Sequence, residues 1–463
     1  MSRFCEAAAN SKGMDVGSLS DRRAYLRAVG GLGLASLAGC VASDAAPSVA
    51  VPSSALTDEP VPVVVKDLDP GASVTLRATA RSRSGRRWES RADFVADDGG
   101  VVDVSERAPL GGTYDCADAT GPFWSMRPAD APDGPLPPGA RFTPPEGAYD
   151  VALAAERGGE TLASATMTRL LFDPDVESRP VGDGLAGRFF APPGDDPVPA
   201  VVHLHGAAGR PHLATGRLLA SRGIAALTLQ YFGDPEPTPD TLTEVPVEYV
   251  ERAVSWLLGR DRVVGSIVGL FGFSRGGSLA LLAASRSDAV GAVVGWVPSG
   301  LVWEGLGRGR APAGTSAWSV DGEPIPFLEL ADADPGPPPT PALPYYEPAL
   351  VGATEAQLDA AAIAVEDADA PVYLVSATDD ARWPSTAFCD RVVDRLDAAN
   401  YAREYRHDRH SGAGHYLRLP YLPTPGVSRD RLHVYGGTPA ANARASAAAW
   451  SETVAFFRRS LSA

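Results

Sequence analysis

One serine in the sequence has the neighbours that a catalytic nucleophile needs. Residues 272–276 read GFSRG, a G-x-S-x-G pattern that places Ser274 between a short apolar run and a stretch with helical spacing. A sharp strand-to-helix turn would expose the Ser274 hydroxyl above a sheet edge, and the flanking glycines permit close backbone approach. We therefore expect a nucleophile; the competing interpretation is a glycine-rich turn in which Ser274 only caps the helix.

A serine nucleophile needs a general base, and four histidines follow Ser274 in the chain. In hydrolases that use this motif, the order along the chain is serine, acid, histidine. His415 lies in the sequence GAGHY, whose small residues let an imidazole project toward the nucleophile. His407 and His410 lie in a polar, Arg- and Asp-rich stretch and are expected at the surface, and His433 lies in a less defined segment. We expect His415 to be the base.

The acid that orients this base is expected just after the apolar run over 371–377, where Thr-Asp-Asp follows. Asp380 is the first choice, because it stands at the position that usually points at the base, and Asp379 is the alternative. For either residue the competing interpretation is an aspartate that caps the helix expected to begin near Ser385.

Two backbone amides are expected to stabilise the negative charge that develops on a carbonyl oxygen. The first is the N–H of Arg275, at the N-terminus of the helix that follows the nucleophile. The second belongs to the loop Gly-Ala-Ala-Gly after the apolar run over 200–206, where Ala207 or Ala208 would donate.

The sequence predicts neither a metal nor a cofactor. His203 and His205 form the one pair that resembles metal ligands, but no Cys, Asp or Glu stands near them, so we expect both to be packing residues. The four cysteines show no C-x-x-C spacing and predict no zinc site. They are Cys5, Cys40, Cys116 and Cys389.

The elements that must position these groups follow a change of pattern near residue 181. From there to residue 463, short apolar runs alternate with stretches of helical spacing, which predicts a mostly parallel sheet with helices on both faces. Strands are predicted over 200–206, 223–232, 266–274, 289–297 and 371–377, and helices over 246–259 and 385–399.

A Pro- and Gly-rich insertion lies at about 301–348, between two of these predicted strands. A cap or lid over the site would emerge there. Trp296, Trp303 and Trp318 lie near this segment. They either line an acyl pocket or belong to the core, and the core is the preferred interpretation.

The preceding part of the chain, residues 61–172, has a β pattern. Apolar and polar residues alternate in about seven short segments separated by turn signals such as Asp-Pro-Gly at 69–71. This predicts a β-sandwich domain. It contains no cluster of ionisable residues with a catalytic character, so we expect a structural or gating role.

The N-terminus resembles an export signal. Arg22 and Arg23 precede an uncharged stretch over 28–39 that is too short to span a bilayer, and residues 37–40 read LAGC. This pattern predicts a twin-arginine signal over 1–40, with a lipobox in which Cys40 carries the lipid, and a flexible tether over 41–60. The protein would then be extracytoplasmic and membrane-anchored; the alternative is an ordinary N-terminal helix of a cytoplasmic protein.

The composition limits the partners. The chain of 463 residues is 44% hydrophobic and carries a formal charge of −16, which favours a sizeable core and argues against nucleic acid or an anionic membrane surface as a ligand. Only Lys12 and Lys66 are lysines, a bias that resembles proteins of halophilic organisms, although a GC-rich genome also favours Arg over Lys. The sequence predicts no oligomeric state.

The chain as a whole resembles the family of acyl-CoA thioester hydrolases and bile acid-CoA:amino acid N-acyltransferases. The resemblance extends from about residue 60 to about 420. It rests on segments in the family's order and spacing: 67–128, 245–258, 268–281, 361–385 and 412–416. It implies two domains, an N-terminal immunoglobulin-like β-sandwich followed by an α/β-hydrolase fold.

The resemblance also implies site residues. The family's nucleophile is Ser in thioesterases and Cys in the acyltransferases, and it falls on Ser274; the acid falls on Asp380 and the base on His415. Two positions depart from the family pattern. Arg275 stands where the family usually has Lys, and the loop sequence HLHGAAG over 203–209 is less Gly-rich than the family's, which leaves the second oxyanion donor open.

The expected function is hydrolysis of an acyl thioester by a Ser-His-Asp triad through an acyl-enzyme, without a cofactor. Acyl-CoA is a cytoplasmic substrate, whereas the N-terminus predicts export. An extracytoplasmic carboxylesterase or lipase-like enzyme that does not use CoA is therefore the alternative. Outside the enzyme class, the alternative is a catalytically silent lipoprotein whose β-sandwich binds a partner.

Overall fold

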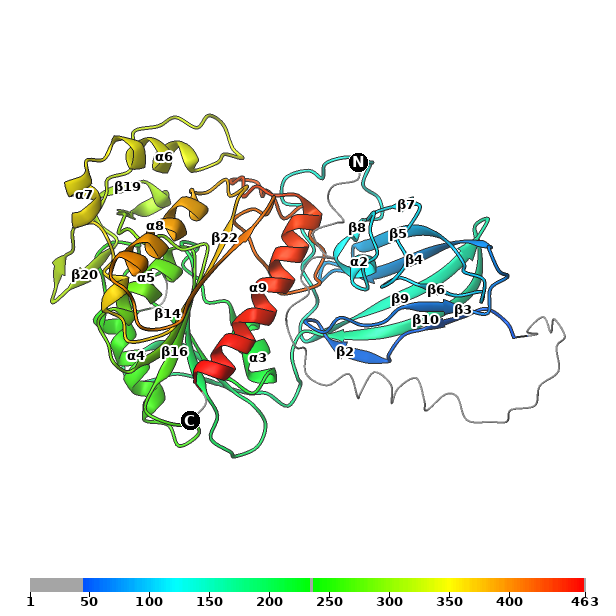
Figure 1. The fold of residues 1–463 in the computed structure, drawn as a ribbon, viewed down its shortest axis with the longest axis horizontal. Helices are drawn as coiled ribbons and strands as arrows, with labels where there is room; N and C mark the ends of the chain where they lie inside the picture. Colours follow the sequence, from blue (N-terminus) through cyan, green and yellow to red (C-terminus); the bar gives the residue numbers. More distant parts are fainter. Residues whose placement is uncertain (1–44, 234–235, 462–463) are drawn as a thin grey trace.

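The computed structural model describes residues 45–233 and 236–461 of the chain. They form a β domain and an α/β domain that lie side by side, with helix α9 (Pro439–Ser460) close to the junction (Figure 1). The predicted export signal, with Arg22, Arg23 and Cys40, lies outside the described residues. In the part of the chain that the structure describes, no helix combines the length and the apolar character of a membrane span.

The β domain consists of two sheets that share one hydrophobic core. The larger sheet has the order β2-β10-β9-β4-β5-β7, with β8 paired to β5, and the smaller has the order β1-β3-β6. Inward residues alternate with outward ones along the long strands, and Trp88 and Phe94 from the larger sheet pack in the same cluster as Val65 from the smaller. The strands are β1 Ser48–Ala50, β2 Ser54–Leu56, β3 Val64–Lys66, β4 Ser73–Arg81, β5 Arg87–Val95, β6 Val102–Asp103, β7 Gly111–Gly112, β8 Arg127–Pro128, β9 Ala148–Arg157 and β10 Glu160–Leu170.

The structure corrects the expected tether over 41–60. Strands β1 and β2 lie within it, and β1 pairs with β3 while β2 runs parallel to β10. Asp58 then forms an ion pair with Arg222 and accepts a hydrogen bond from Trp450 Nε1 at 2.8 Å. The Ala-, Ser- and Pro-rich composition did not predict these strands. A three-residue edge strand is stabilised by pairing with strands elsewhere in the sequence, and its own residues carry little signal.

The α/β domain is built on an eight-stranded sheet of order β11-β12-β14-β13-β16-β17-β22-β23. All pairs from β14 to β23 are parallel, and only β11 and β12 are antiparallel to their neighbours. This is an α/β-hydrolase fold, and the predicted mostly parallel sheet is confirmed. The strands are β11 Glu177–Pro180, β12 Ala186–Ala191, β13 Ala200–Leu204, β14 Ala225–Gln230, β16 Val268–Phe273, β17 Val290–Trp296, β22 Val372–Ala377 and β23 Tyr405–His410.

Helices cover both faces of this sheet. Successive residues of a strand point to opposite faces, so Val202 packs in the cluster with α4, α5 and α8, whereas Val201 packs in the cluster with α3 and α9. Figure 1 shows α3 and α9 on one side and α4, α5 and α8 on the other. Their bounds are α3 Leu213–Ser221, α4 Glu248–Leu258, α5 Arg275–Ala284 and α8 Ser385–Ala398.

Strand β23 corrects the expectation for His407 and His410, which were placed at the surface. Both lie on this edge strand, and the His407 side chain is only 3% exposed. Its Nε2 lies 2.7 Å from the hydroxyl oxygen of Ser376 on the neighbouring strand. The polar character of the segment reflects an edge strand whose side chains bind one another across the sheet.

The segment over 301–348 folds into short strands and the start of a helix rather than an open loop. It contains β18 Glu304–Leu306, β19 Pro312–Ser316, β20 Trp318–Val320, β21 Glu323–Pro324 and the beginning of α6 Leu343–Gly352. In Figure 1, β19 and α6 lie together at one end of the α/β domain. The inserted segment therefore builds a wall of the α/β domain, which positions it to cover a site at the end of the strands.

The segment between His415 and α9 packs on the β domain. The Arg418 guanidinium donates to Phe142 O at 3.0 Å, the Arg429 guanidinium donates to Leu136 O at 3.1 Å, and Leu422 lies in the core cluster of the β domain. This segment leads directly out of the GAGHY loop. The two domains therefore meet next to the residues expected to do chemistry.

Candidate active site

Ser274 lies on a tight turn between β16 and α5. Its backbone has φ 56° and ψ −124°, a conformation that L-residues rarely adopt. The turn needs glycine on both sides, because a Cβ at Gly272 would lie 2.1 Å from Gly276 O, and one at Gly276 would lie 2.3 Å from His205 O. The G-x-S-x-G pattern therefore has a steric cause here, and the side chain of Ser274 is held at the end of the strand.

Replacing Gly276 with alanine is expected to destabilise the fold. The added methyl group would collide with the carbonyl oxygens of Leu204 and His205, which are backbone atoms that cannot turn aside. We expect the free energy of unfolding to fall by ~3 kcal/mol in urea denaturation. Gly352→Ala is the matched control, because nothing lies within 4 Å of that position, and its stability should change by less than about 1 kcal/mol. Equal stability of G276A and the wild type would contradict the close packing.

The structure brings the three residues of the expected triad together. His415 Nε2 lies 2.9 Å from Ser274 Oγ, and His415 Nδ1 lies 2.8 Å from Asp380 Oδ2. Each of the three is buried. Asp379, the alternative acid, is exposed, whereas the carboxylate oxygen within hydrogen-bond distance of the imidazole belongs to Asp380.

Asp380 is itself held in place. Its Oδ1 accepts hydrogen bonds from the backbone N–H groups of Arg382 at 2.8 Å and Trp383 at 3.2 Å, which leaves Oδ2 directed at His415. The rings of Phe273 and Trp383 pack edge-on against the imidazole, with centroids at 5.4 Å and 5.8 Å. These contacts fix the plane of the ring between the carboxylate and the serine hydroxyl.

The backbone of the histidine loop is anchored by the segment that returns from the β domain. His415 N–H donates to Tyr435 O at 2.8 Å, and Gly414 N–H donates to Asn442 Oδ1 at 2.8 Å. Gly436 forms a bridge with Asp380. The loop that carries Asp380 and the loop that carries His415 are therefore connected to each other through residues 435 and 436.

A cavity of about 550 Å³ opens over Ser274 and His415. It is lined by the loop at 206–208, the tight turn at 273–275, the loop that carries His415 and the segment 306–346 of the insertion. Ala207, Ala208 and Arg275, the expected oxyanion donors, all lie on this wall. The insertion thus contributes to the wall of the cavity that contains Ser274, and the volume lies within the range of small-molecule sites.

Comparison with known proteins fits this arrangement. The sequence matches the N-terminal region of the acyl-CoA thioester hydrolase/BAAT family over residues 58–183 and the family's C-terminal domain over residues 245–463. It is 30% identical to human acyl-coenzyme A thioesterase 1 over 424 residues, which cover 87% of this chain and 94% of that protein. The chain belongs to the acyl-CoA thioester hydrolase/BAAT family. Membership makes it an enzyme of the thioester hydrolase class.

Other members and one solved structure complete the comparison. The mouse peroxisomal succinyl-coenzyme A thioesterase is 29% identical over 416 residues, covering 87% of this chain and 94% of that protein. A dienelactone hydrolase-like phosphotriesterase from metagenomic libraries is 16% identical with a TM-score of 0.39, covering 62% of this chain and 100% of that one. The family expected from the sequence is thereby confirmed by relatives of nearly full length.

In this family member, the tryptophans near the insertion do not line the cavity over Ser274. Trp303 and Trp318 are fully buried, and Trp296 packs on the other face of the sheet, where its Nε1 donates to Thr453 Oγ1 at 3.0 Å. The core interpretation therefore holds for all three. Trp383 lines the cavity instead, and no signal in the sequence distinguished it.

His203 and His205 are packing residues, as expected. The His205 ring stacks on Tyr231 with centroids 4.2 Å apart, and the His203 ring packs edge-on against Phe271. Burial is the main cause that lowers the pKa of His205 to about 3, and it also lowers the pKa of His203 and His212. Within the described residues, no group of three or more His, Cys, Asp or Glu side chains is arranged to hold a metal ion.

The buried neutral state of His205 predicts a loss of stability in acid. In the unfolded chain His205 binds a proton below its ordinary pKa near 6.5, whereas in the folded chain it does so only near pH 3. Acid therefore favours the unfolded state, and stability present at pH 7.5 is lost as the pH falls. Between pH 7.5 and pH 4.5 the free energy of unfolding should fall by about 2–3 kcal/mol more in the wild type than in His205→Gln. Urea denaturation at both pH values measures this difference, and equal losses in the two proteins would contradict it.

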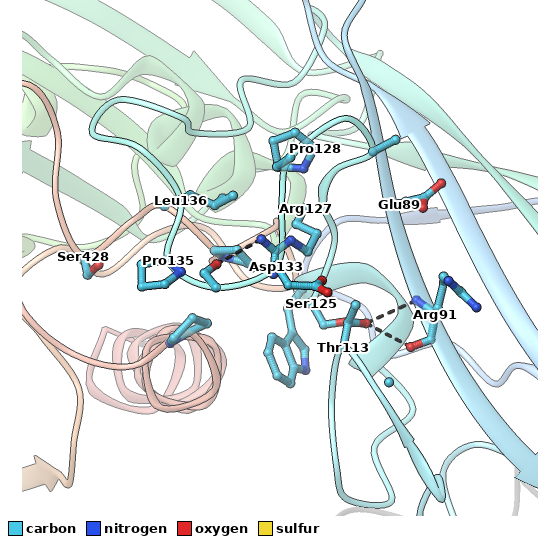
Figure 2. A pocket seen from close by; sticks show the side chains of 18 of the residues that line it. Glu89, Arg91, Thr113, Ser125, Arg127, Pro128, Asp133, Pro135, Leu136 and Ser428 are labelled. Atoms are coloured by element: carbon cyan, nitrogen blue, oxygen red, sulfur yellow. Dashed lines mark hydrogen bonds between the residues drawn. The ribbon is translucent and has the colours of Figure 1, made fainter.

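A second and larger cavity, of about 1100 Å³, lies between the β domain and residues 425–439 (Figure 2). Ser274 is not among the residues that line it. Thr113 Oγ1 bonds to both the N–H and the carbonyl of Arg91 (Figure 2). The Arg127 guanidinium donates to Pro132 O and Gly134 O. Some polar groups on this wall thus bind the backbone around them, while others bind side chains, as Glu89 does in its ion pairs with Arg77 and Arg87.

Proposed function

We propose that this protein hydrolyses acyl thioesters with Ser274 as the nucleophile, His415 as the general base and Asp380 as the residue that orients the base. The observation that carries the proposal is the continuous pair of contacts, 2.9 Å from Ser274 Oγ to His415 Nε2 and 2.8 Å from His415 Nδ1 to Asp380 Oδ2. Membership of the acyl-CoA thioester hydrolase/BAAT family supports the same reaction class.

In the first half of the reaction, His415 takes the proton of Ser274 while Oγ attacks the thioester carbonyl. Asp380 holds the tautomer in which Nδ1 carries the proton, and it stabilises the imidazolium that forms. The carbonyl oxygen becomes an oxyanion within reach of the N–H of Arg275 and of Ala207 or Ala208. The tetrahedral intermediate then collapses, the carbon–sulfur bond breaks, and His415 returns its proton to the departing thiolate.

In the second half, the acyl group is released from the serine ester. His415 removes a proton from a water molecule, whose oxygen attacks the ester carbonyl of the acyl-enzyme. The carbon–oxygen bond to Ser274 breaks, and the imidazolium returns the proton to Oγ. The products are the free acid and the free thiol. Serine as the nucleophile supports water rather than an amine as the acceptor, because the family's amine-acylating members use cysteine at this position.

The acyl-enzyme gives a direct test. The purified full chain is mixed with an acyl-CoA or a p-nitrophenyl ester at high salt, quenched with acid within milliseconds, and digested for mass spectrometry. We expect the acyl mass on the peptide that contains Ser274 and a burst of thiol or nitrophenol of about one equivalent. If folded protein turns over neither substrate, the hydrolase proposal is refuted.

A second candidate is an extracytoplasmic esterase whose substrate carries no CoA. The observation that favours it is the twin-arginine and lipobox pattern over residues 21–40, which supports export and lipid attachment at Cys40. Fractionation of the native host separates the two candidates. Processed protein in the membrane fraction, labelled by lipid at Cys40, supports the esterase, whereas full-length protein in the cytosol supports acyl-CoA as the substrate.

A further inference from the structure

The cavity over Ser274 has a charge that is opposite to that of the chain. The chain has 57 Asp and Glu residues against 41 Lys and Arg residues. Among the described residues that line this cavity, however, three are arginines and none is Asp or Glu. The arginines are Arg275, Arg310 and Arg382. A wall that excludes carboxylates in such an acidic chain is suited to an anion.

The three guanidinium groups differ in what they already bind. Arg275 is buried, and its Nη2 donates to Glu304 O and to the Tyr346 hydroxyl, both at 3.0 Å. Arg382 is half-buried, and its Nη1 donates to Thr340 O at 3.1 Å. Arg310 is exposed, and its Nη1 lies 3.3 Å from His433 Nε2. Arg275 therefore supports the wall of the insertion, while Arg382 and Arg310 line the cavity and each contact a described residue through only one of their nitrogens, Nη1.

Neither Arg310 nor Arg382 has an ion-pair partner among the described residues. In the described part of the chain, no carboxylate lies within ion-pair distance of either guanidinium. The acidic groups closest in the fold are engaged elsewhere, since Asp380 binds His415 and Asp430 accepts a hydrogen bond from the Tyr435 hydroxyl at 2.7 Å. Burial is the main cause that lowers the pKa of Arg382; the nearby Tyr346, Tyr435 and Asp380 raise it, and Arg310 lowers it further. Two cations without an ion-pair partner among the described residues therefore line one cavity.

We propose that Arg310 and Arg382 bind an anionic group of the substrate at this cavity, which makes them determinants of specificity. The chemistry is that of a compact oxyanion with several acceptor oxygens, as in a phosphate or a carboxylate, which a guanidinium fork binds through two parallel hydrogen bonds. Such a group has two sources in an acyl thioester: a phosphate of the thiol carrier, or a carboxylate at the far end of the acyl chain. This inference rests on the proposed function, because it names what else the thioester carries.

The test uses three substrates with the same reacting bond. They are butyryl-CoA, succinyl-CoA and the butyryl thioester of N-acetylcysteamine, which has no anionic group. The variants are Arg310→Gln and Arg382→Gln, with Arg310→Lys and Arg382→Lys as charge-retaining partners. The matched control is Arg308→Gln, which removes the same charge from the same turn at an exposed position outside the cavity wall.

Two patterns would support the proposal and identify the source of the anion. If the carrier's phosphate is bound, kcat/KM falls about tenfold or more for both CoA thioesters in each Gln variant and stays within twofold for the N-acetylcysteamine thioester. If the acyl carboxylate is bound, kcat/KM falls for succinyl-CoA alone. In both cases the Lys variants keep part of the activity, and R308Q behaves as the wild type.

Other results would overturn it. Equal changes for the neutral and the anionic thioesters, no change at all, or the same loss in R308Q would each show that the two arginines do not recognise an anion. A binding measurement covers variants with poor turnover: inorganic pyrophosphate should bind the wild type in a calorimetric titration, and its dissociation constant should rise about tenfold in R382Q. Failure of the proposed function is distinct, because the wild type would then hydrolyse none of the three substrates.

Discussion

The Ser274→Ala protein is expected to fold as the wild type does and to hydrolyse acyl thioesters about 10⁵-fold more slowly. In the proposed mechanism the substitution removes the atom that attacks the thioester carbonyl, while the backbone turn at φ 56° and the packing of the glycines are expected to stay in place. The residual activity of the variant would come from direct attack by water, with the backbone amides stabilising the oxyanion. This contribution to the rate is small compared with that of the serine. Steady-state kinetics on an acyl-CoA, together with circular dichroism for the fold, measure the effect.

Ser285→Ala is the control for this experiment. Ser285 lies at the other end of the same helix, where its hydroxyl donates to Leu282 O at 2.9 Å, far from the cavity wall. Its removal should leave kcat unchanged. A Ser274→Ala protein that keeps more than about a hundredth of the wild-type kcat would assign the nucleophile to another group and would refute the triad.

The Asp380→Asn protein is expected to lose about 10⁴-fold in kcat with little change in KM. The carboxamide has nearly the shape of the carboxylate, so the hydrogen bonds from the N–H groups of Arg382 and Trp383 can persist. Its NH₂ group, however, would face His415 Nδ1 and favour the tautomer whose Nε2 carries the proton. That tautomer cannot accept the proton of Ser274, so the rate falls although the site keeps its shape.

Asp379→Asn provides the matched control, because it makes the same change one residue away on an exposed side chain. Its kcat should equal that of the wild type within about twofold. The opposite ranking, with Asp379→Asn impaired and Asp380→Asn active, would show that the loop rearranges in solution and that Asp379 orients the base. The two variants therefore decide between the acids that the sequence left open.

The central strands of the α/β domain could be predicted from the sequence because each is a continuous apolar run that is buried on both faces. β13, β16, β17 and β22 all lie within the expected ranges. Strands β1, β2 and β23 were not predicted as strands, because two of them are three-residue edge strands and the third is highly polar. Helix α9 was also missed, since its alanine-rich sequence has only a weak amphipathic pattern.

The contacts among Ser274, His415 and Asp380 could be anticipated from the sequence, because the order serine, acid, histidine after a G-x-S-x-G turn is typical of hydrolases that use this motif. The wall around them could not. Arg310 comes from the insertion, Arg382 from the loop after β22, and Tyr435 from the segment that returns from the β domain. Only the tertiary fold brings these three segments to one cavity. A single sequence therefore contains no local pattern that predicts which of their residues line it.

The docking of residues 416–436 on the β domain has a consequence for how the two domains can diverge. A Cβ at Gly426 would lie 1.9 Å from Ala140 O, and Arg141 of the β domain lies 4.8 Å over the ring of Tyr416, next to the base. A substitution on either surface is therefore expected to shift the loop that carries His415. Exchange of one domain for that of a relative would therefore alter these contacts, and we expect such a chimaera to keep its stability only when both domains come from the same protein.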